Sequence, residues 1–195
     1  MTETFDAVVI GGGPAGSTAA ADLARNGRSV LLLDRAGRIK PCGGAIPPVC
    51  VREFAIPDSQ IVARATGARI VSPTAKEADM PITGGYVGMV DREGFDEYLR
   101  ERAADAGAER RTGTFDKVGR DPDGVAVVHY KTTDGPAQVR ARAIIGSVTC
   151  GLPQLGQPSD LWCESCKGIP VVSATRRASA MLSTSVSPSL RIWVA

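Results

Sequence analysis

Three glycines close to the start of the chain have the spacing of a loop that binds the pyrophosphate of a dinucleotide. They are Gly11, Gly13 and Gly16, with Pro14 and Ala15 between the last two. The first glycine allows a tight turn, the second lets the backbone approach the phosphates, and the third lets a helix pack closely on a strand. The amides at the start of that helix then face the phosphates at the positive end of its dipole. The spacing predicts a dinucleotide site at this turn.

The segments around the glycines complete the supersecondary unit that such a site requires. Residues 5–10 form an apolar run of strand length, residues 17–26 favour a helix, and residues 30–33 favour a buried parallel strand. That strand ends at Asp34, whose carboxylate can accept hydrogen bonds from the hydroxyls of a ribose. The same carboxylate would repel the 2′-phosphate of NADP at this site. The alternative is a glycine-rich turn in an α/β protein that binds no nucleotide.

Composition excludes several classes of partner and location. The 195 residues suffice for one domain with a small addition, and the 23 Lys and Arg nearly balance the 21 Asp and Glu, which excludes a strongly basic nucleic-acid-binding face. The sequence has no apolar run long enough to span a membrane and does not start like a signal peptide. Five cysteines in a chain of this kind indicate a reducing compartment and no disulfide framework. We expect a cytoplasmic protein.

The rest of the chain predicts further elements and one long loop. Residues 36–57 are rich in glycine and proline and are expected to be irregular. Asp91 is expected to cap the helix over residues 95–106, whose acidic side chains should form a solvated face: Glu93, Asp96, Glu97 and Glu101. The predicted strands are 68–71, 86–90 and 114–118, followed by an antiparallel hairpin of 124–130 and 137–145.

Three stretches together resemble the geranylgeranyl reductase family of flavoproteins, in the branch of chlorophyll and bacteriochlorophyll synthesis. They are residues 6–16 with Asp34 and Arg35, the Lys-Pro-Cys-Gly-Gly loop at 40–44, and Met-Val-Asp-Arg at 89–92. The resemblance covers residues 1–146 and implies an α/β, Rossmann-like FAD/NAD(P)-binding fold related to the aromatic hydroxylases. By this resemblance, residues 1–146 are the FAD-binding domain with the start of an interleaved substrate region.

The resemblance also implies the residues that hold the cofactor. The glycine loop, with Pro14 and Ala15, would hold the FAD pyrophosphate, and Asp34 would hold the ribose. The remaining positions are Arg35 near the adenosine, Gly43 and Gly44 by the isoalloxazine ring, and Arg92 at the start of its helix. Cys42, in the same loop as Gly43, has two readings: a catalytic thiol that supplies a proton to the substrate, or a small packing residue.

The activity implied is an oxidoreductase reaction on carbon–carbon double bonds. Electrons would pass from NADPH to FAD and then to the geranylgeranyl chain of a pigment or of its diphosphate, giving phytyl. An isolated alkene is poorly activated, so a flavin must carry the chemistry and the protein must position it. The isoprenoid substrate leads us to expect contact with the periphery of a photosynthetic membrane, although the sequence shows no amphipathic anchor.

The sequence departs from the family after Gly146. Such flavoproteins continue with Ala-Asp-Gly, whereas here Ser147 opens a serine-rich stretch with two acidic residues, Asp160 and Glu164. We expect residues 147–195 to be an irregular, non-native or disordered tail that follows a frameshift or early end. The chain as written is then an inactive fragment that binds FAD weakly or not at all. Cys163 and Cys166 have the spacing of a metal site, but too few partners accompany them, and no metal is expected.

Two other interpretations of the chain's function stay open. The first is an FAD-dependent aromatic monooxygenase, which shares the glycine motif and Arg92 and would consume oxygen with an aromatic substrate. The second is a non-catalytic nucleotide-binding fragment, or a product that fails to fold. Stabilisation by FAD without turnover would support the fragment, and insolubility would support the folding defect.

Overall fold

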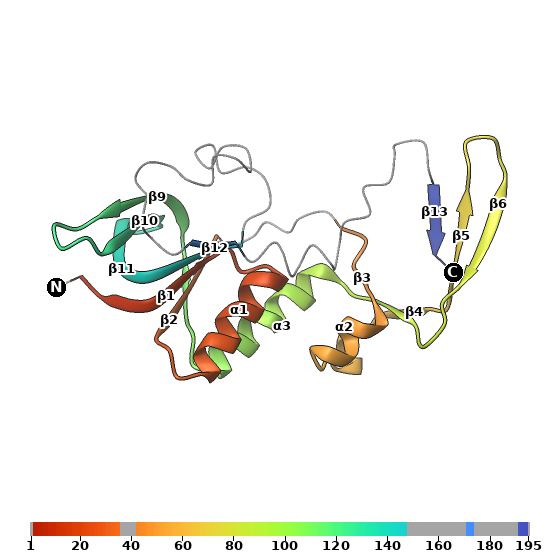
Figure 1. The fold of residues 1–195 in the computed structure, drawn as a ribbon, viewed down its shortest axis with the longest axis horizontal. Coiled ribbons are helices and arrows are strands. Elements are labelled where there is room, and N and C mark those ends of the chain that lie inside the picture. The colour runs from red at the N-terminus through yellow and green to blue at the C-terminus, as the bar shows by residue number, and fades with distance from the viewer. Residues whose placement is uncertain (1, 36–41, 148–170, 174–190, 195) are drawn as a thin grey trace. The chain divides into compact units, whose positions relative to one another are not determined.

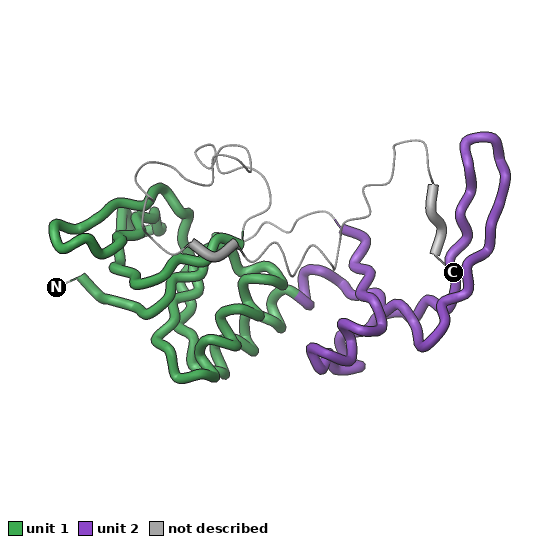
Figure 2. The backbone as a smooth tube through the Cα atoms, viewed as in Figure 1, with its two compact units in different colours: residues 1–38, 96–176 green, residues 39–95, 177–195 purple. Residues whose placement is uncertain are grey.

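The computed structural model divides the chain into two compact units (Figure 2). Unit 1 comprises residues 1–38 and 96–176, and unit 2 comprises residues 39–95 and 177–195. The residues that the structure describes are 2–35, 42–147, 171–173 and 191–194. Most of the segment 147–195, including Cys163 and Cys166, lies outside them, so its expected irregularity stays a prediction.

Unit 1 is built on one mixed sheet (Figure 1). Its strands run in the order β8-β2-β1-β11-β10-β9, and β12 pairs with β11. Their bounds are β1 Thr4–Ile10, β2 Val30–Asp34, β8 Glu109–Thr112, β9 Thr114–Arg120, β10 Ala126–Thr132, β11 Gly135–Gly146 and β12 Val171–Ser173. The pairs among β8, β2, β1 and β11 are parallel, whereas β9, β10 and β11 pair antiparallel. This arrangement confirms the predicted Rossmann-like α/β fold with its hairpin.

The two faces of the parallel strands are buried by different layers, because side chains alternate along a strand. One face packs on helices α1 (Pro14–Arg25) and α3 (Arg92–Asp105), which lie side by side in Figure 1. Its core joins strand residues to alanines of both helices and of the turn before β8: Val9, Val30, Leu32, Ala20, Ala21, Ala103 and Ala108. The alanines let both helices approach the sheet closely.

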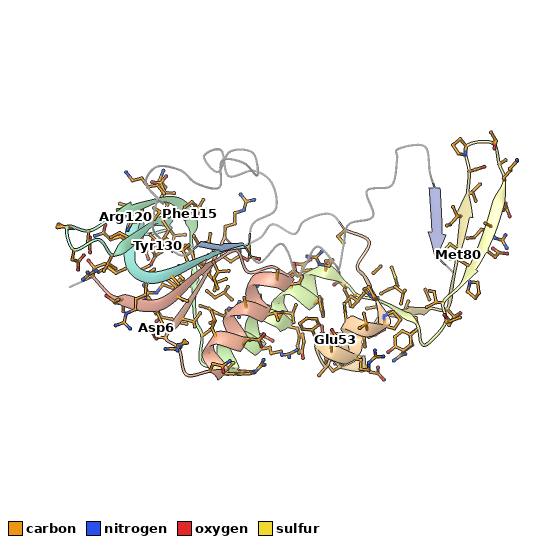
Figure 3. The ribbon with its side chains drawn as sticks, viewed as in Figure 1. Asp6, Glu53, Met80, Phe115, Arg120 and Tyr130 are labelled. Atoms are coloured by element: carbon orange, nitrogen blue, oxygen red, sulfur yellow. The ribbon has the colours of Figure 1, made fainter. Side chains whose placement is uncertain are left out.

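The opposite face packs on side chains of the antiparallel strands. Val8, Leu31 and Leu33 enter this core from β1 and β2. Tyr130 on β10 belongs to the same core, and its register partner Phe115 on β9 packs against it, as Figure 3 shows. The end of β2, where Asp34 lies, is therefore fixed by packing on both faces of the sheet.

Unit 2 contains two small antiparallel sheets, β3-β7-β4 and β13-β5-β6. The bounds are β3 Ala45–Ile46, α2 Pro48–Glu53, the 3-10 helix Asp58–Gln60, β4 Ala63–Ala65, β5 Gly67–Val71, β6 Glu77–Pro81, β7 Val87–Met89 and β13 Arg191–Val194. Strands β5 and β6 form a hairpin, and the side chain of Met80 on β6 is exposed (Figure 3).

Two sequence-based expectations were wrong, and one strand was not predicted. Helix α2 lies within the stretch expected to be irregular, and Pro48, whose fixed φ suits a first turn, begins it. Strand β8 was not predicted, because it is a polar segment without an apolar pattern; it is held by pairing with β2. Asp96 was expected on a solvated face of α3, but it is buried at 5% exposure.

Candidate dinucleotide-binding site

The glycine loop joins β1 to α1 in a tight turn within unit 1. Gly11 has φ +104°, a conformation that favours glycine, and its N–H donates to the carbonyl of Leu33 on β2 at 2.8 Å. Gly16 lies so close to the turn that a Cβ built on it would be 1.8 Å from the carbonyl oxygen of Gly11. A side chain at position 16 would therefore force α1 away from β1.

Gly13 differs from its two neighbours because nothing lies within 4 Å of the position its Cβ would take. It caps α1, and Pro14 follows in the first turn. Because the first N–H groups of a helix have no partner inside it, the amides of Ala15 and Gly16 are available at this end. Ser17 closes the turn, with its N–H donating to the Gly13 carbonyl at 2.9 Å. Open space at a helix N-terminus suits an anion such as a pyrophosphate.

Asp34 lies against the same loop at the carboxyl end of β2. A Cβ on Gly12 would be 2.6 Å from its Oδ2, so the carboxylate packs directly beside the backbone of the loop. Burial raises the pKa of the Asp34 carboxyl, and the positive charge of Arg100 opposes that rise. The side chain stays 29% exposed. A carboxylate in this place can accept hydrogen bonds from a ligand that occupies the loop.

Arg100 and Gly12 complete the site, and sequence reasoning missed both. Arg100 lies on α3 and donates from Nη1 to the Gly12 carbonyl at 3.1 Å and to Asp34 Oδ2 at 3.5 Å. Its position on a helix 66 residues beyond Asp34 gave no local signal. Gly12 was visible in the glycine run, but only the contact with Asp34 explains why it is glycine.

The other predicted site residues belong to unit 2 or to its boundary. Cys42 is exposed, and Gly43 has open space where its Cβ would be. Gly44 has φ +70° and a Cβ there would be 2.1 Å from the carbonyl oxygen of Val90, so packing inside unit 2 already explains this glycine. Arg92 is the first residue of α3.

The structure thus brings together one group of predicted residues. Gly11, Gly13, Gly16 and Asp34 lie around one loop in unit 1, together with Pro14 and Ala15. Arg35 follows Asp34 and is exposed. In the described part of the chain, no cluster of His, Cys, Asp or Glu could hold a metal ion. None of its described helices is both long and apolar enough to cross a membrane.

Comparison with known proteins places the chain in a family. The family model described as "Lycopene cyclase protein" matches residues 6–178. A geranylgeranyl diphosphate reductase of Rhodobacter capsulatus is 58% identical over 144 residues, which are 73% of this chain and 37% of that protein. The chain belongs to the family that this model describes, on its geranylgeranyl reductase branch. The match to the family model extends past Gly146, so the resemblance does not end there as expected from the sequence.

Solved structures support the same placement. A geranylgeranyl bacteriochlorophyll reductase-like protein of Thermoplasma acidophilum has a TM-score of 0.68 at 26% identity, over 80% of this chain and 44% of that chain. A myxobacterial chondrochloren halogenase, described as a variant of FAD-dependent halogenases, has a TM-score of 0.62 at 25% identity, over 74% and 37% of the two chains. The chain therefore has the fold of FAD-dependent enzymes. It spans 37% of the length of the Rhodobacter reductase.

Proposed function

We propose that the protein is an FAD-dependent oxidoreductase that uses NADPH to reduce the geranylgeranyl chain of a pigment, or of its diphosphate, to phytyl. The observation that carries the proposal is the open space beside Gly13 at the start of α1. The family match supplies the substrate class, because a relative 58% identical over 144 residues is named a geranylgeranyl diphosphate reductase. An isoprenoid substrate would favour contact of a cytoplasmic enzyme with the periphery of a photosynthetic membrane.

The residues of unit 1 fit the ADP half of FAD. Gly13 leaves room for the two phosphates, and the N–H groups of Ala15 and Gly16 point from the first turn of α1. Asp34, beside the same loop, would accept the hydroxyls of the adenosine ribose. A carboxylate there disfavours the 2′-phosphate of NADPH, so NADPH would act as a reductant from another place.

The chemistry divides between cofactor and protein. Bound FAD supplies a two-electron carrier between NADPH and an isolated alkene, to which one hydride equivalent and one proton are added. The chain's own part is to hold the ADP half through the loop and Asp34. The exposed Cys42 thiol carries a proton at Sγ that would go to the second alkene carbon. The alternative for Cys42 is a packing role in its loop.

A binding experiment tests the first half of the proposal. FAD, ADP and FMN are titrated into the full chain and into Gly13→Ala by calorimetry. The sequence alone led us to expect weak FAD binding or none, but the glycine loop and Asp34 are complete among the described residues. We therefore expect FAD and ADP to bind and FMN to fail, because FMN lacks the ADP half that the loop would hold. The methyl group of Gly13→Ala would occupy the approach of the phosphates and weaken FAD binding by at least about tenfold, or ~1.4 kcal/mol. Equal binding of FMN and FAD would contradict the proposal.

A chimera tests the activity. Residues 1–146 of this chain replace the aligned part of the Rhodobacter reductase, over which the two are 58% identical. We expect the chimera to oxidise NADPH in step with reduction of geranylgeranyl diphosphate, and the same chimera with Gly13→Ala to lose that activity. Oxygen consumption with an aromatic substrate, without alkene reduction, would instead select the monooxygenase reading. A chimera that binds FAD but does neither would refute the reductase assignment for these residues.

A further inference from the structure

Arg100 connects the two parts of the loop site that would bind phosphate and ribose. Its Nη1 lies 3.1 Å from the carbonyl oxygen of Gly12 and 3.5 Å from Oδ2 of Asp34. Its Nε donates to Oε2 of Glu97, one turn earlier on α3, at 2.8 Å. The side chain is 22% exposed, so protein surrounds most of it. Helix α3 thus reaches the loop through the guanidinium of Arg100.

The guanidinium is held rigidly at both ends. Glu97 is fixed from a second side, because Arg110 donates to its Oε1 at 2.8 Å. The planar fork of an arginine keeps its donors at fixed angles, so anchoring Nε also orients Nη1. Gly12 makes the contact possible, since a Cβ there would lie 3.0 Å from the Cδ of Arg100. A lysine, with one flexible donor group, could not span the same partners in a fixed geometry.

We propose that Arg100 is a positioning residue for the adenosine ribose, which turns the Asp34 carboxylate toward the hydroxyls of a bound ADP moiety. The inference rests on the proposed function, because it assumes that the loop holds the ADP half of FAD. It adds a residue on α3 that touches no part of the ligand itself. Without the guanidinium, Asp34 keeps its place at the end of β2 and its backbone N–H donors at Gly12 and Arg35, but it loses the side-chain donor that constrains Oδ2 from α3.

The electrostatics around Asp34 give the proposal a pH signature. The charged groups that face the carboxylate are Arg100 from α3 and Arg35, the next residue in the chain. The glycine loop contributes backbone N–H, and the register partner on β8 is the uncharged Thr112. Burial raises the pKa of Asp34, and Arg100 is the largest influence in the opposite direction. Loss of Arg100 therefore raises this pKa further, so the carboxylate becomes protonated at a higher pH.

The test compares ADP with 2′-deoxy-ADP, which lacks one hydroxyl that Asp34 would bind. Both are titrated into the full-length wild type, Arg100→Ala, Arg100→Lys and Arg25→Ala. Arg25 is the control because it pairs with Asp22 on the surface of α1, and its loss also removes one positive charge. We expect wild type and Arg25→Ala to prefer ADP by about tenfold, the range of one charge-assisted hydrogen bond. In Arg100→Ala the preference falls to about twofold, and Arg100→Lys lies between.

Two further measurements separate positioning from a general loss of structure. In Arg100→Ala, the loss of ADP affinity on acidification begins at a higher pH than in wild type. In Asp34→Asn, the preference for ADP is already small, and adding Arg100→Ala lowers it no further. A full preference and an unchanged pH profile in Arg100→Ala would overturn the inference while leaving the nucleotide site intact. Failure of the wild type to bind ADP at all would overturn the proposed function as well.

Discussion

The contact between Gly16 and the loop gives a prediction whose size follows from geometry. In Gly16→Ala, the added methyl group would lie 1.8 Å from the carbonyl oxygen of Gly11, whereas such atoms normally stay about 3.3 Å apart. The backbone of the turn or the start of α1 must therefore move by roughly 1.5 Å. Such overpacking costs about 1–3 kcal/mol. It also pulls α1 away from β1, where Ala20 packs on Val9 in one core.

The assay is thermal unfolding followed by circular dichroism, with Gly13→Ala as the matched control. A loss of about 2 kcal/mol corresponds to a fall in Tm of roughly 5–10 °C for a unit of this size. Gly13 has φ −75° and open space, so alanine is expected to stay within about 0.5 kcal/mol of wild type there. The two variants thus separate folding from ligand binding. A Gly16→Ala protein as stable as wild type, or equal destabilisation by both changes, would refute the reasoning.

Three other substitutions have expected signs. Asp34→Asn should raise the free energy of unfolding of the ligand-free protein at neutral pH by ~0.5 kcal/mol, because burial raises the pKa of Asp34 and its charge therefore opposes folding. Denaturant titration measures this free energy, and a less stable variant would contradict the prediction. Gly44→Ala should destabilise unit 2 by about 2–4 kcal/mol, because its Cβ would be 2.1 Å from the Val90 carbonyl oxygen at φ +70°. Limited proteolysis tests this, and cleavage of the variant at the same rate as wild type would contradict it. Arg110 lowers the pKa of Glu97, so Glu97→Gln should cost ~0.5 kcal/mol above pH ~4.5, and this cost should shrink as the pH falls through the lowered pKa. A cost that persists once acid has protonated the wild-type carboxyl would count against the ion pair.

The first strand, glycine loop, helix and second strand could be predicted because each has a local signal. The apolar run of β1 stops at Gly11, and the apolar residues of β2 end at Asp34. Strand β8 had no such signal, because its polar residues are held by pairing with a strand more than 70 residues earlier, as in Leu31 with Glu109. Its position depends on the fold and not on its own composition.

The residues of the candidate site also divide into those with a local sequence signal and those without one. Gly11, Gly13 and Gly16 follow a spacing that the backbone itself requires. Arg100 donates a hydrogen bond to the Gly12 carbonyl, from which 88 residues separate it in the sequence, and the packing of α3 beside α1 brings the two together. Gly44 was predicted as a cofactor residue, and its contact with Val90 supplies a second reason for glycine at that position that the sequence did not reveal.

The central claim is that the loop between β1 and α1 binds the pyrophosphate of FAD, and amide NMR tests it most directly. ADP is titrated into the ¹⁵N-labelled chain, and the backbone amides of Gly13, Ala15 and Gly16 are followed. The account predicts that these three signals shift together with one dissociation constant, and that adenosine, which lacks the phosphates, leaves them in place. Saturation by ADP with these amides unmoved would contradict the claim.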